Sequence, residues 1–368
     1  MSSAGTLKII TEGKTKLIVP DVENPSGPAT HAAVFYNPAM VSNRDVSVLY
    51  ARCRAREGWL FLDALAGTGA RGVRLAVEVP VKMQVHINDM SQEAVGVMKE
   101  NIQINGLKNV TTSQQDLHDL LPGVRYDWID LDPYGSPINF IDQSVQKLPR
   151  GGTLSITATD TAPLCGTFPR ACARRYMARP MKSQCKHELG LRILVGNIVR
   201  RAAVLDVALF PELAYYQGHF FRSYFRLERG ATKASGQIEK IGYLQWDDKE
   251  GFSTNQESPE GKDWAGPLWL GDLTDKTLVK EMLAKSDETI SKTTSGLLQA
   301  LDAELTQPPY HYNTDFIARL LNRRPMKMLD TLETLRKKGF SASTVHYDPK
   351  GFKTDAGLGE IIKILGNT

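Results

Sequence analysis

Cysteine is scarce in this sequence. The 368 residues include four, at Cys53, Cys165, Cys172 and Cys185. No two of them form a Cys-x-x-Cys pair, and four are too few for a disulfide scaffold in a chain of this length. We therefore expect Cys165, Cys172 and Cys185 to be buried reduced thiols, and no metal site, because these cysteines and His187 lack zinc-ligand spacing.

Long apolar runs are also missing. No stretch approaches the roughly 18 consecutive apolar residues that a membrane helix needs, and the first eight residues contain no apolar core of a signal peptide. A hydrophobic content of 42% and a charged content of 23% are ordinary for a globular protein. We therefore expect a cytoplasmic protein without membrane contact. The net charge of +4 is too small to indicate a binding partner, so the clustering of charged residues along the chain is more informative.

The chain is predicted to contain three regions, 1–56, 57–229 and 230–368. The first holds a hairpin up to about Val19 and a helix from about Asn43 to Arg56. In the second, short apolar runs alternate with helical stretches, which is typical of a parallel, doubly wound sheet. Strands are predicted at 59–64, 84–88, 109–112, 127–131 and 153–157, and helices at 69–79, 91–105 and 137–148.

Two further β-rich runs, 206–210 and 219–226, follow each other closely. Parallel neighbours need a crossover of a dozen or more residues, so this pair is predicted to be antiparallel. A mostly parallel sheet with an antiparallel last strand is the α/β fold of class I methyltransferases and differs from the all-parallel sheets that bind dinucleotides.

The third region looks smaller and mixed. Residues 230–271 are polar and are interpreted as a linker or a small irregular insert. Helices are predicted at 274–304, 314–321 and 326–338, followed by a two-stranded wing at 341–345 and 351–353. This order suggests a C-terminal α+β domain, similar in outline to a winged helix, that binds nucleic acid.

A glycine-rich turn, Asp63-Ala-Leu-Ala-Gly67-Thr-Gly69-Ala-Arg-Gly72, joins the first predicted strand of the sheet to a helix. The glycines fit a dinucleotide fingerprint, in which a pyrophosphate approaches the helix N-terminus. Asp63 at the strand end fits S-adenosylmethionine instead, since a carboxylate favours its ammonium and backbone N–H groups favour its carboxylate. The turn alone does not separate these readings from a purely structural one.

Two more acidic residues end neighbouring strands. Asp89 follows the second strand and is placed to accept hydrogen bonds from the ribose hydroxyls of either cofactor. Asp116 follows the third strand, where it either accepts from the adenine amino group or caps the next helix.

The fourth strand favours methyl transfer. It runs into Asp132-Pro133-Tyr134-Gly135-Ser136-Pro137 beside the expected cofactor crevice. An exocyclic amine of a base is a poor nucleophile because its lone pair is delocalised into the ring. A carboxylate and a backbone carbonyl that accept its two N–H bonds can aim this lone pair at a methyl group, and an aromatic side chain can stack on the base. Asp132 is also placed to take the released proton. The structural alternative is a capped turn before a helix.

The chain resembles the tRNA (guanine-26-N2)-dimethyltransferase family, in its compact archaeal form, along nearly its whole length. The matching stretches are 35–40 with 43–45, the Asp63 turn, 132–137, 157–166, 192–196, 214–216 and 266–271. The resemblance implies that S-adenosylmethionine donates two methyl groups in turn to N2 of one guanine in tRNA. It also implies that Arg44 grips the methionine carboxylate, and that Phe35 and Tyr134 sandwich the flipped guanine around Asp132.

Some members of that family carry a Cys-x-x-Cys zinc pair before the Gly-Pro-x-Trp stretch. This chain has no cysteine between Gly230 and Gly271, which again predicts no metal. No obligate protein partner is evident.

Basic residues cluster between residues 170 and 201, with Glu188 as the one acidic residue among them. Such one-sided charge is typical of a phosphate-binding surface, although many charge runs are only solvated helix faces. The cations are Arg170, Arg174, Arg175, Arg179, Lys182, Lys186, Arg192, Arg200 and Arg201. The first five are our candidates for RNA contact. Arg323, Arg324, Lys327 and residues 336–338 could extend that surface in the C-terminal domain.

Two alternatives stay open at the level of sequence. An adenine-N6 methyltransferase on RNA or DNA uses an Asp-Pro-Pro-aromatic motif, whereas Pro133 here is followed directly by Tyr134. A nicotinamide-dependent oxidoreductase would use the Gly67–Gly72 turn but leaves the Asp132 motif and the basic cluster without a role.

Overall fold

The computed structural model describes residues 6–21 and 34–367. Its central sheet contains seven strands, β3 (Leu60–Asp63), β4 (Gln84–Asp89), β5 (Val110–Gln114), β6 (Trp128–Leu131), β7 (Thr153–Ala158), β8 (Val207–Gln217) and β9 (Phe220–Arg229). Their order is β5-β4-β3-β6-β7-β9-β8. The first five are parallel, whereas β9 runs antiparallel to both β7 and β8. This arrangement confirms the predicted class I methyltransferase sheet.

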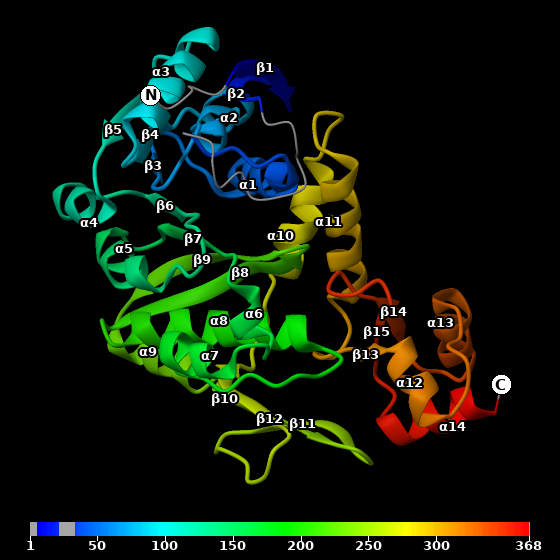
Figure 1. Ribbon diagram of the computed structural model, residues 1–368. Coiled ribbons are helices and arrows are strands. Elements are labelled where there is room, and N and C mark those ends of the chain that lie inside the picture. The colour runs from blue at the N-terminus through cyan, green and yellow to red at the C-terminus, as the bar shows by residue number, and fades with distance from the viewer. Residues whose placement is uncertain (1–5, 22–33, 368) are drawn as a thin grey trace.

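Helices cover both faces of this sheet (Figure 1). Buried side chains on one face belong to the cluster that includes α1, α2 and α3, and those on the other to the cluster that includes α4, α5 and α8. Because both faces are covered, strands such as β7 are buried along their whole length. These helices are α1 (Val41–Arg54), α2 (Ala70–Glu78), α3 (Gln92–Ile104), α4 (Leu117–Leu120), α5 (Ile141–Lys147) and α8 (Lys186–Ala203).

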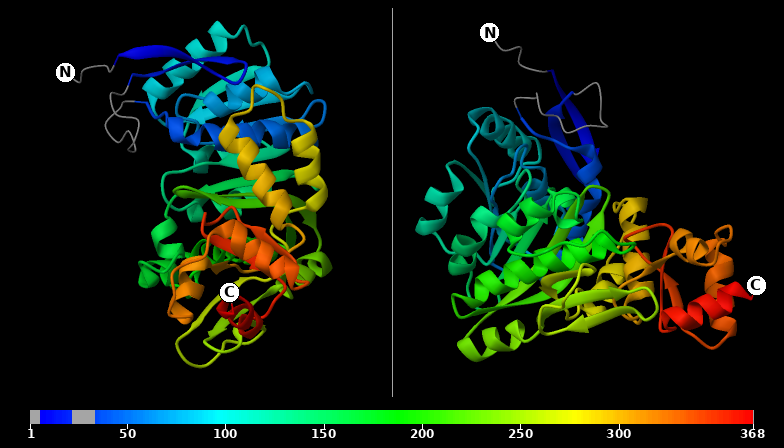
Figure 2. Two further views of the ribbon diagram at one scale, coloured as in Figure 1. Left: turned by 90° about the vertical axis from the view of Figure 1, so that its right-hand side faces the viewer. Right: turned by 60° about the horizontal axis from the view of Figure 1, so that its bottom comes forward.

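The predicted N-terminal hairpin is confirmed as β1 (Leu7–Glu12) and β2 (Thr15–Pro20). It is fixed to α3, because the Asn101 side chain accepts a hydrogen bond from the Ile18 backbone at 2.6 Å and donates one back at 3.1 Å. The hairpin and the C-terminal elements lie at opposite ends of the molecule (Figure 2).

The interpretation of residues 230–271 as an irregular linker is wrong. They form α9 (Ala231–Ile238) and a three-stranded antiparallel sheet of β10 (Ile241–Asp247), β11 (Gly251–Asn255) and β12 (Trp264–Trp269). Leu244, Leu268 and Trp269 from this sheet are buried in the same core as α8. A Cβ atom on Gly196 of α8 would lie 2.9 Å from the Trp269 backbone nitrogen, so glycine permits this close approach. Polar residues on the exposed side of the sheet concealed its apolar side.

The single helix predicted at 274–304 is two helices, α10 (Lys276–Ala284) and α11 (Lys292–Glu304). The Asp45 carboxylate of α1 accepts hydrogen bonds from the Ser291 backbone and the Thr294 hydroxyl, at 3.0 and 2.9 Å, and fixes the start of α11. Both helices share a core with α1. The boundary at residue 230 therefore stays a prediction, and part of the third region packs on the first.

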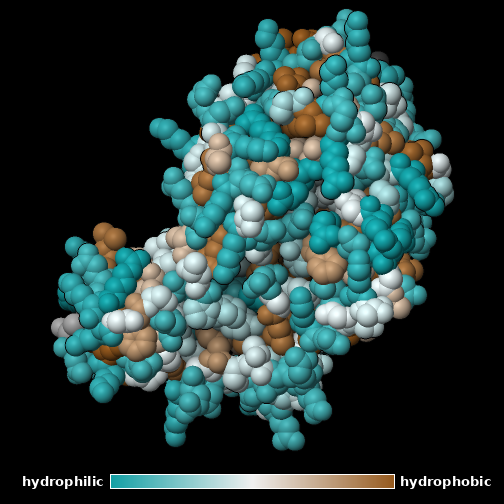
Figure 3. All heavy atoms as spheres, turned by 180° about the vertical axis from the view of Figure 1, so that it is seen from behind, coloured by the Kyte–Doolittle hydropathy of each residue, from teal (hydrophilic) through white to brown (hydrophobic). Residues whose placement is uncertain are grey.

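The rest of the third region forms a small α+β unit with its own core around Leu335, Phe352 and Ile361, as predicted. Seen from behind, it is a lobe beside the main body, and hydrophilic side chains cover most of this face (Figure 3). The predicted order of two helices and a two-stranded wing is confirmed, and a further strand and a last helix were not expected. The elements are β13 (Tyr312–Asn313), α12 (Thr314–Leu320), α13 (Met328–Lys337), β14 (Ala342–Thr344), β15 (Gly351–Thr354) and α14 (Leu358–Gly366).

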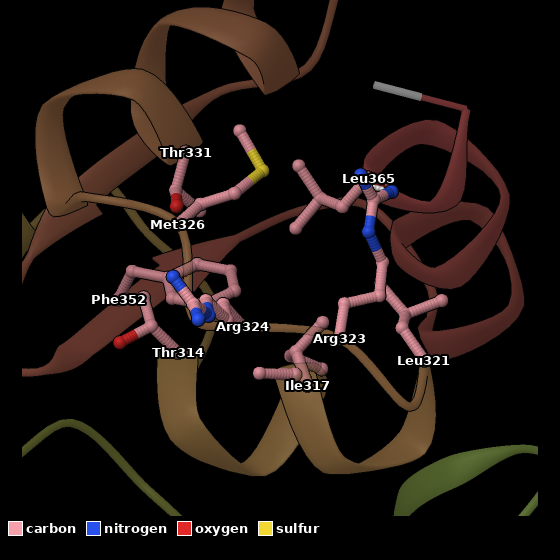
Figure 4. Close-up of a pocket in the computed structure, with 10 residues that line it drawn as sticks. Thr314, Ile317, Leu321, Arg323, Arg324, Met326, Thr331, Phe352 and Leu365 are labelled. Carbon is pink, nitrogen blue, oxygen red and sulfur yellow. Dashed lines mark hydrogen bonds between the residues drawn. The ribbon is translucent and has the colours of Figure 1, made fainter.

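Figure 4 shows a small pocket in this lobe, with Ile317, Met326 and Leu365 around it and Arg323 and Arg324 beside it. Its volume of about 20 Å³ leaves room for one water molecule and none for a cofactor. In the parts of the chain that the structure describes, no helix has the length and apolar character needed to cross a membrane. Cys165, Cys172 and Cys185 are buried free thiols, as predicted.

Candidate active site

A cavity of about 1090 Å³ opens where the carboxyl ends of β3, β4, β6 and β7 meet. Ligands bind at this edge in open α/β sheets, and the volume exceeds what one drug-sized molecule fills. Its lining comes from the segment before α1, the glycine-rich turn and the residues that follow the four strands. The lining residues are Phe35, Tyr36, Asn37, Ala39, Met40, Arg44, Asp63, Leu65, Ala66, Gly67, Thr68, Ala70, Arg71, Asp89, Met90, Asp132, Pro133, Tyr134, Ser136, Asn139, Phe140, Thr159, Thr161 and His219.

The glycine-rich turn is held in one shape. Gly67 and Gly69 have φ values of +54° and +74°, which side-chain-bearing residues rarely adopt. A Cβ atom on Gly67 would also lie 2.6 Å from the Phe35 carbonyl oxygen. The Gly72 N–H donates to the Asp63 carboxylate at 3.0 Å. The turn is therefore tight, and Asp63, Gly67 and Thr68 all line the cavity.

Asp89 and Asp116 have different surroundings. Asp89 lines the cavity, and its carboxylate accepts hydrogen bonds from the Gly67 N–H at 2.9 Å and the Ser91 N–H at 3.0 Å. It therefore joins the end of β4 to the glycine-rich turn. Asp116 accepts from the His118 N–H at 2.7 Å and caps α4, the alternative that the sequence left open, and it is not among the cavity-lining residues of the described chain.

Arg44 lines the cavity but has a protein partner. Its Nε and Nη2 atoms donate to the Glu12 carboxylate at 2.6 and 2.8 Å, and Tyr36 and Arg74 donate to the same carboxylate at 2.8 Å. Burial acts to raise the pKa of Glu12, but the charges of Arg44 and Arg74 and the hydrogen bonds from Arg44 and Tyr36 together lower the pKa to about 2. Glu12 thus anchors the β1–β2 hairpin to the cavity wall.

Asp132 lies at the end of β6 with one fifth of its side chain exposed to the cavity. The Arg71 Nη2 atom contacts its carboxylate directly. Arg71 itself is 5% exposed and donates from Nη1 to Asn43 at 2.9 Å and to Ser47 at 2.6 Å. Its Nε atom lies 3.3 Å from Asp130. Every side of this guanidinium is therefore occupied, and it holds Asp132 in one orientation.

A second buried arginine, Arg222, shares the partner Asp130 with Arg71 in the cavity floor. Arg222 of β9 and Asp130 of β6 are both fully buried and form an ion pair, and Ser155 donates to Asp130 at 2.6 Å. Burial acts to raise the pKa of Asp130, but the charges of Arg222 and Arg71 lower it. Burial also raises the pKa of Asp63 to about 7, against the charge of Arg71. The floor thus combines an ionised Asp130 with an Asp63 that titrates near neutral pH.

Phe35 and Tyr134 lie together at the cavity mouth, as the resemblance implies, but they touch each other. Their ring centroids are 4.6 Å apart and the rings are nearly perpendicular. A base stacked between two rings needs roughly 7 Å, twice the carbon–carbon contact distance. The sandwich is therefore closed here, and the rings must separate before a guanine can enter.

The basic segment is less uniform than its sequence indicates. Arg192 is buried against Glu188, and Arg201 pairs with Asp142 at 2.7 Å, so neither contributes an uncompensated surface charge. Of the five RNA-binding candidates, Arg170, Arg174 and Arg175 are exposed on α7 (Pro169–Tyr176), and Lys182 is exposed beyond it. The fifth, Arg179, is half-buried and lies 4.3 Å from the Trp264 ring centre.

Sequence reasoning missed several cavity residues. Arg71 stood in the quoted glycine-rich motif, yet nothing in the motif showed that it would meet Asp132. Thr159 and Thr161 lay in a stretch that carried the resemblance and received no role. The cavity residue His219 gave no sequence signal, and neither did Glu12, which holds Arg44 from outside the cavity lining.

The fold and this site define a class I S-adenosylmethionine-dependent methyltransferase. A family model described as N2,N2-dimethylguanosine tRNA methyltransferase matches residues 11–366. The tRNA (guanine(26)-N(2))-dimethyltransferase of Thermococcus kodakarensis is 38% identical over 98% of this chain and 99% of its own length. That of Methanococcus maripaludis is 37% identical over 98% of both. The solved structure of Trm1 from Pyrococcus horikoshii with S-adenosyl-L-methionine is 36% identical, with a TM-score of 0.88 over 97% of this chain and 99% of that one.

The chain belongs to the N2,N2-dimethylguanosine tRNA methyltransferase family. These matches confirm the predicted family, the predicted methylation of guanine N2 in tRNA and S-adenosylmethionine as the methyl donor. They favour neither adenine-N6 methylation nor nicotinamide-dependent oxidation.

Proposed function

We propose that this chain transfers two methyl groups in succession to N2 of guanine 26 in tRNA, with Asp132 holding the amine. The observation that carries this assignment is the position of Asp132, which shares one cavity with the glycine-rich turn and is fixed by Arg71. The family gives the substrate and the methyl donor, and the geometry of the cavity supports the residue roles that we assign.

S-adenosylmethionine brings an electrophilic methyl group on a sulfonium. Asp63 is assigned to its ammonium, because a carboxylate places the opposite charge there. The N–H groups of Gly67, Thr68 and Gly69 are weaker candidates for its carboxylate, since they already donate to Asp89, to the Phe35 carbonyl and to the Ala66 carbonyl. Asp89 is assigned to the ribose hydroxyls. Arg44 is a weaker candidate for the carboxylate, since Glu12 already occupies its fork, and Asp116 a weaker candidate for the adenine, since it caps α4.

Asp132 accepts an N–H bond from the guanine amine, and the carbonyl of Pro133 accepts the other. Both bonds draw the nitrogen lone pair out of conjugation and aim it at the methyl carbon, so correct placement provides much of the rate. As the new N–C bond forms, the bond from the methyl carbon to sulfur breaks and leaves a neutral thioether, and one N–H proton passes to Asp132, which releases it to solvent before the second transfer. After the first transfer a single N–H remains, and Asp132 still holds it for the second.

A guanine stacked in tRNA must leave its stack to reach Asp132. Phe35 and Tyr134 then separate and stack on its two faces. Arg170, Arg174, Arg175, Arg179 and Lys182 are assigned to phosphates of the tRNA. Cytoplasmic location, the absence of a metal and the absence of an obligate protein partner stay predictions.

The test is incubation of the protein with unmodified tRNA and methyl-labelled S-adenosylmethionine, followed by nucleoside analysis. We expect monomethylguanosine early and dimethylguanosine late, and no label on a tRNA with adenine at position 26. Label on an adenine would favour the adenine-N6 alternative, and no label on any tRNA would refute the assignment.

A further inference from the structure

Phe168 is an aromatic side chain without a structural explanation. Among the residues that the structure describes, Tyr134 and Phe168 are the two large aromatic side chains that are exposed, at 63% and 59%. Tyr134 has a role as a stacking surface for the target guanine. Phe168 is placed just before α7, where the next residues are Pro169 and the exposed Arg170.

The backbone of Phe168 is joined to the segment that lines the active-site cavity after β7. Thr159 and Thr161 line that cavity directly after β7. The carbonyl of Ala162 accepts hydrogen bonds from the Thr167 and Phe168 N–H groups, at 2.9 and 3.4 Å. The Phe168 backbone is therefore hydrogen-bonded to Ala162, the residue that follows the cavity-lining Thr161.

The platform that carries Phe168 is fixed to the cavity wall. On the far side of α7, the Tyr176 hydroxyl donates to Asp160 at 2.5 Å and lies 3.0 Å from the Ser136 hydroxyl. Arg175 also donates to Asp160 at 3.0 Å. On the near side, Gly166 has a φ of +87°, and a Cβ there would lie 3.2 Å from the Lys182 backbone nitrogen. One end of the segment is thus tied to Ser136, which lines the cavity, and the other packs closely against Lys182, so the exposed ring is carried by a fixed backbone.

We propose that Phe168 stacks on a nucleobase next to the flipped guanine, at the place that the guanine vacates. A rigid exposed aromatic side chain beside exposed cations combines the two features with which proteins bind nucleobases, a stacking surface and phosphate contacts. Apolar side chains that enter a stack also stabilise its distorted form. This inference rests on the proposed function, because it needs a guanine that leaves its stack at this cavity.

The test uses tRNA with the fluorescent base 2-aminopurine at position 26, without methyl donor, and the full chain with Phe168→Ala, Phe168→Trp and Met177→Ala. Met177 is the matched control, since it is 67% exposed at the other end of α7. For Phe168→Ala we expect tRNA affinity to fall about 5- to 150-fold, the range that base–aromatic stacking gives. We also expect the fluorescence increase on unstacking to shrink at saturation, and Phe168→Trp to restore both.

Equal behaviour of Phe168→Ala and Met177→Ala in both measurements would overturn the proposal. Weaker binding with an undiminished fluorescence increase would overturn the placement beside the target. Failure of the proposed function gives a different result, because the unsubstituted protein would then methylate no guanine in tRNA.

Discussion

The cavity floor and the α7 surface carry charge in opposite ways. In the floor, Arg71, Asp130 and Arg222 are buried, and each has more than one polar partner. On the α7 side, Arg170 and Lys182 are exposed, and within residues 6–21 and 34–367 neither has an acidic partner within 4.0 Å.

The difference separates two tasks. Removing one partner of a buried pair leaves an uncompensated charge and costs about 3–5 kcal/mol, so buried charges define a fixed geometry. An exposed ion pair contributes only about 0–1 kcal/mol, so exposed cations are free to exchange water and counterions for phosphates. We therefore expect floor substitutions to lower kcat or stability, and α7 substitutions to change tRNA affinity and its salt dependence.

The largest effect on activity is expected at Asp132, which lines the cavity and is held by Arg71 of the floor. Asp132→Asn keeps the size of the side chain but removes its charge and its capacity to take a proton. We expect kcat to fall about 10²–10⁴-fold, the range of acid–base catalysis, with cofactor affinity largely unchanged. Single-turnover methylation and a cofactor titration measure the two quantities. An active Asp132→Asn protein would remove Asp132 from its assigned role.

Arg71→Lys tests whether the floor acts through geometry. Lysine keeps the positive charge but cannot contact Asn43, Ser47 and Asp132 together. We expect kcat to fall about 10–100-fold at unchanged KM for tRNA, because a displacement near 1 Å can cost that much.

The matched control is Arg74→Lys, in the same helix, where the buried arginine pairs with Glu12, Asp45 and Glu78 and not with Asp132 among the described residues. Both variants should lose thermal stability, and Arg71→Lys alone should lose kcat beyond that loss. Equal kcat values in the two variants would count against a positioning role for Arg71.

The α7 surface is tested by replacing Arg170, Arg174 and Lys182 together with alanine. If each contacts one phosphate, the slope of log affinity against log salt should decrease by about 2–3. We expect KM for tRNA to rise about tenfold at moderate salt, while kcat changes little. Arg150→Ala is the control, since Arg150 is exposed just before β7, at the opposite edge of the sheet from the cavity. A slope that matches this control would show that tRNA binds elsewhere.

The sequence predicted the features that depend on local order along the chain. Asp63, Asp89 and Asp132 each end a parallel strand, and parallel strands present their carboxyl ends at one edge, so their convergence followed from the strand pattern. The glycine positions followed from the tight strand–helix turn.

Features that depend on distant partners were not predictable from one sequence. Arg71 reaches Asp132 only because β3 and β6 are neighbours in the sheet, and this spatial order does not follow from their order along the chain. Arg201 was counted as a free cation because its partner, Asp142, lies 59 residues away in the chain. Residues 230–271 were interpreted as a linker or irregular insert because a sheet with one solvent-exposed face has a polar average composition.

The smallest effect concerns pH and again separates the floor from the surface. Burial raises the pKa of Asp63 to about 7, so Asp63 is mostly protonated at pH 6 before the cofactor binds. An ammonium placed beside it favours the carboxylate, and between pH 5.5 and 7 that ammonium stays charged. Binding should therefore release a proton, and cofactor affinity should weaken up to tenfold for each pH unit below 7.

Calorimetry in two buffers of different ionisation enthalpy measures the number of protons released on binding. Asp63→Asn should abolish both this proton release and the pH dependence of affinity. Binding at pH 6 without proton release would place the ammonium away from Asp63, whereas the α7 alanine variants should leave this pH dependence unchanged.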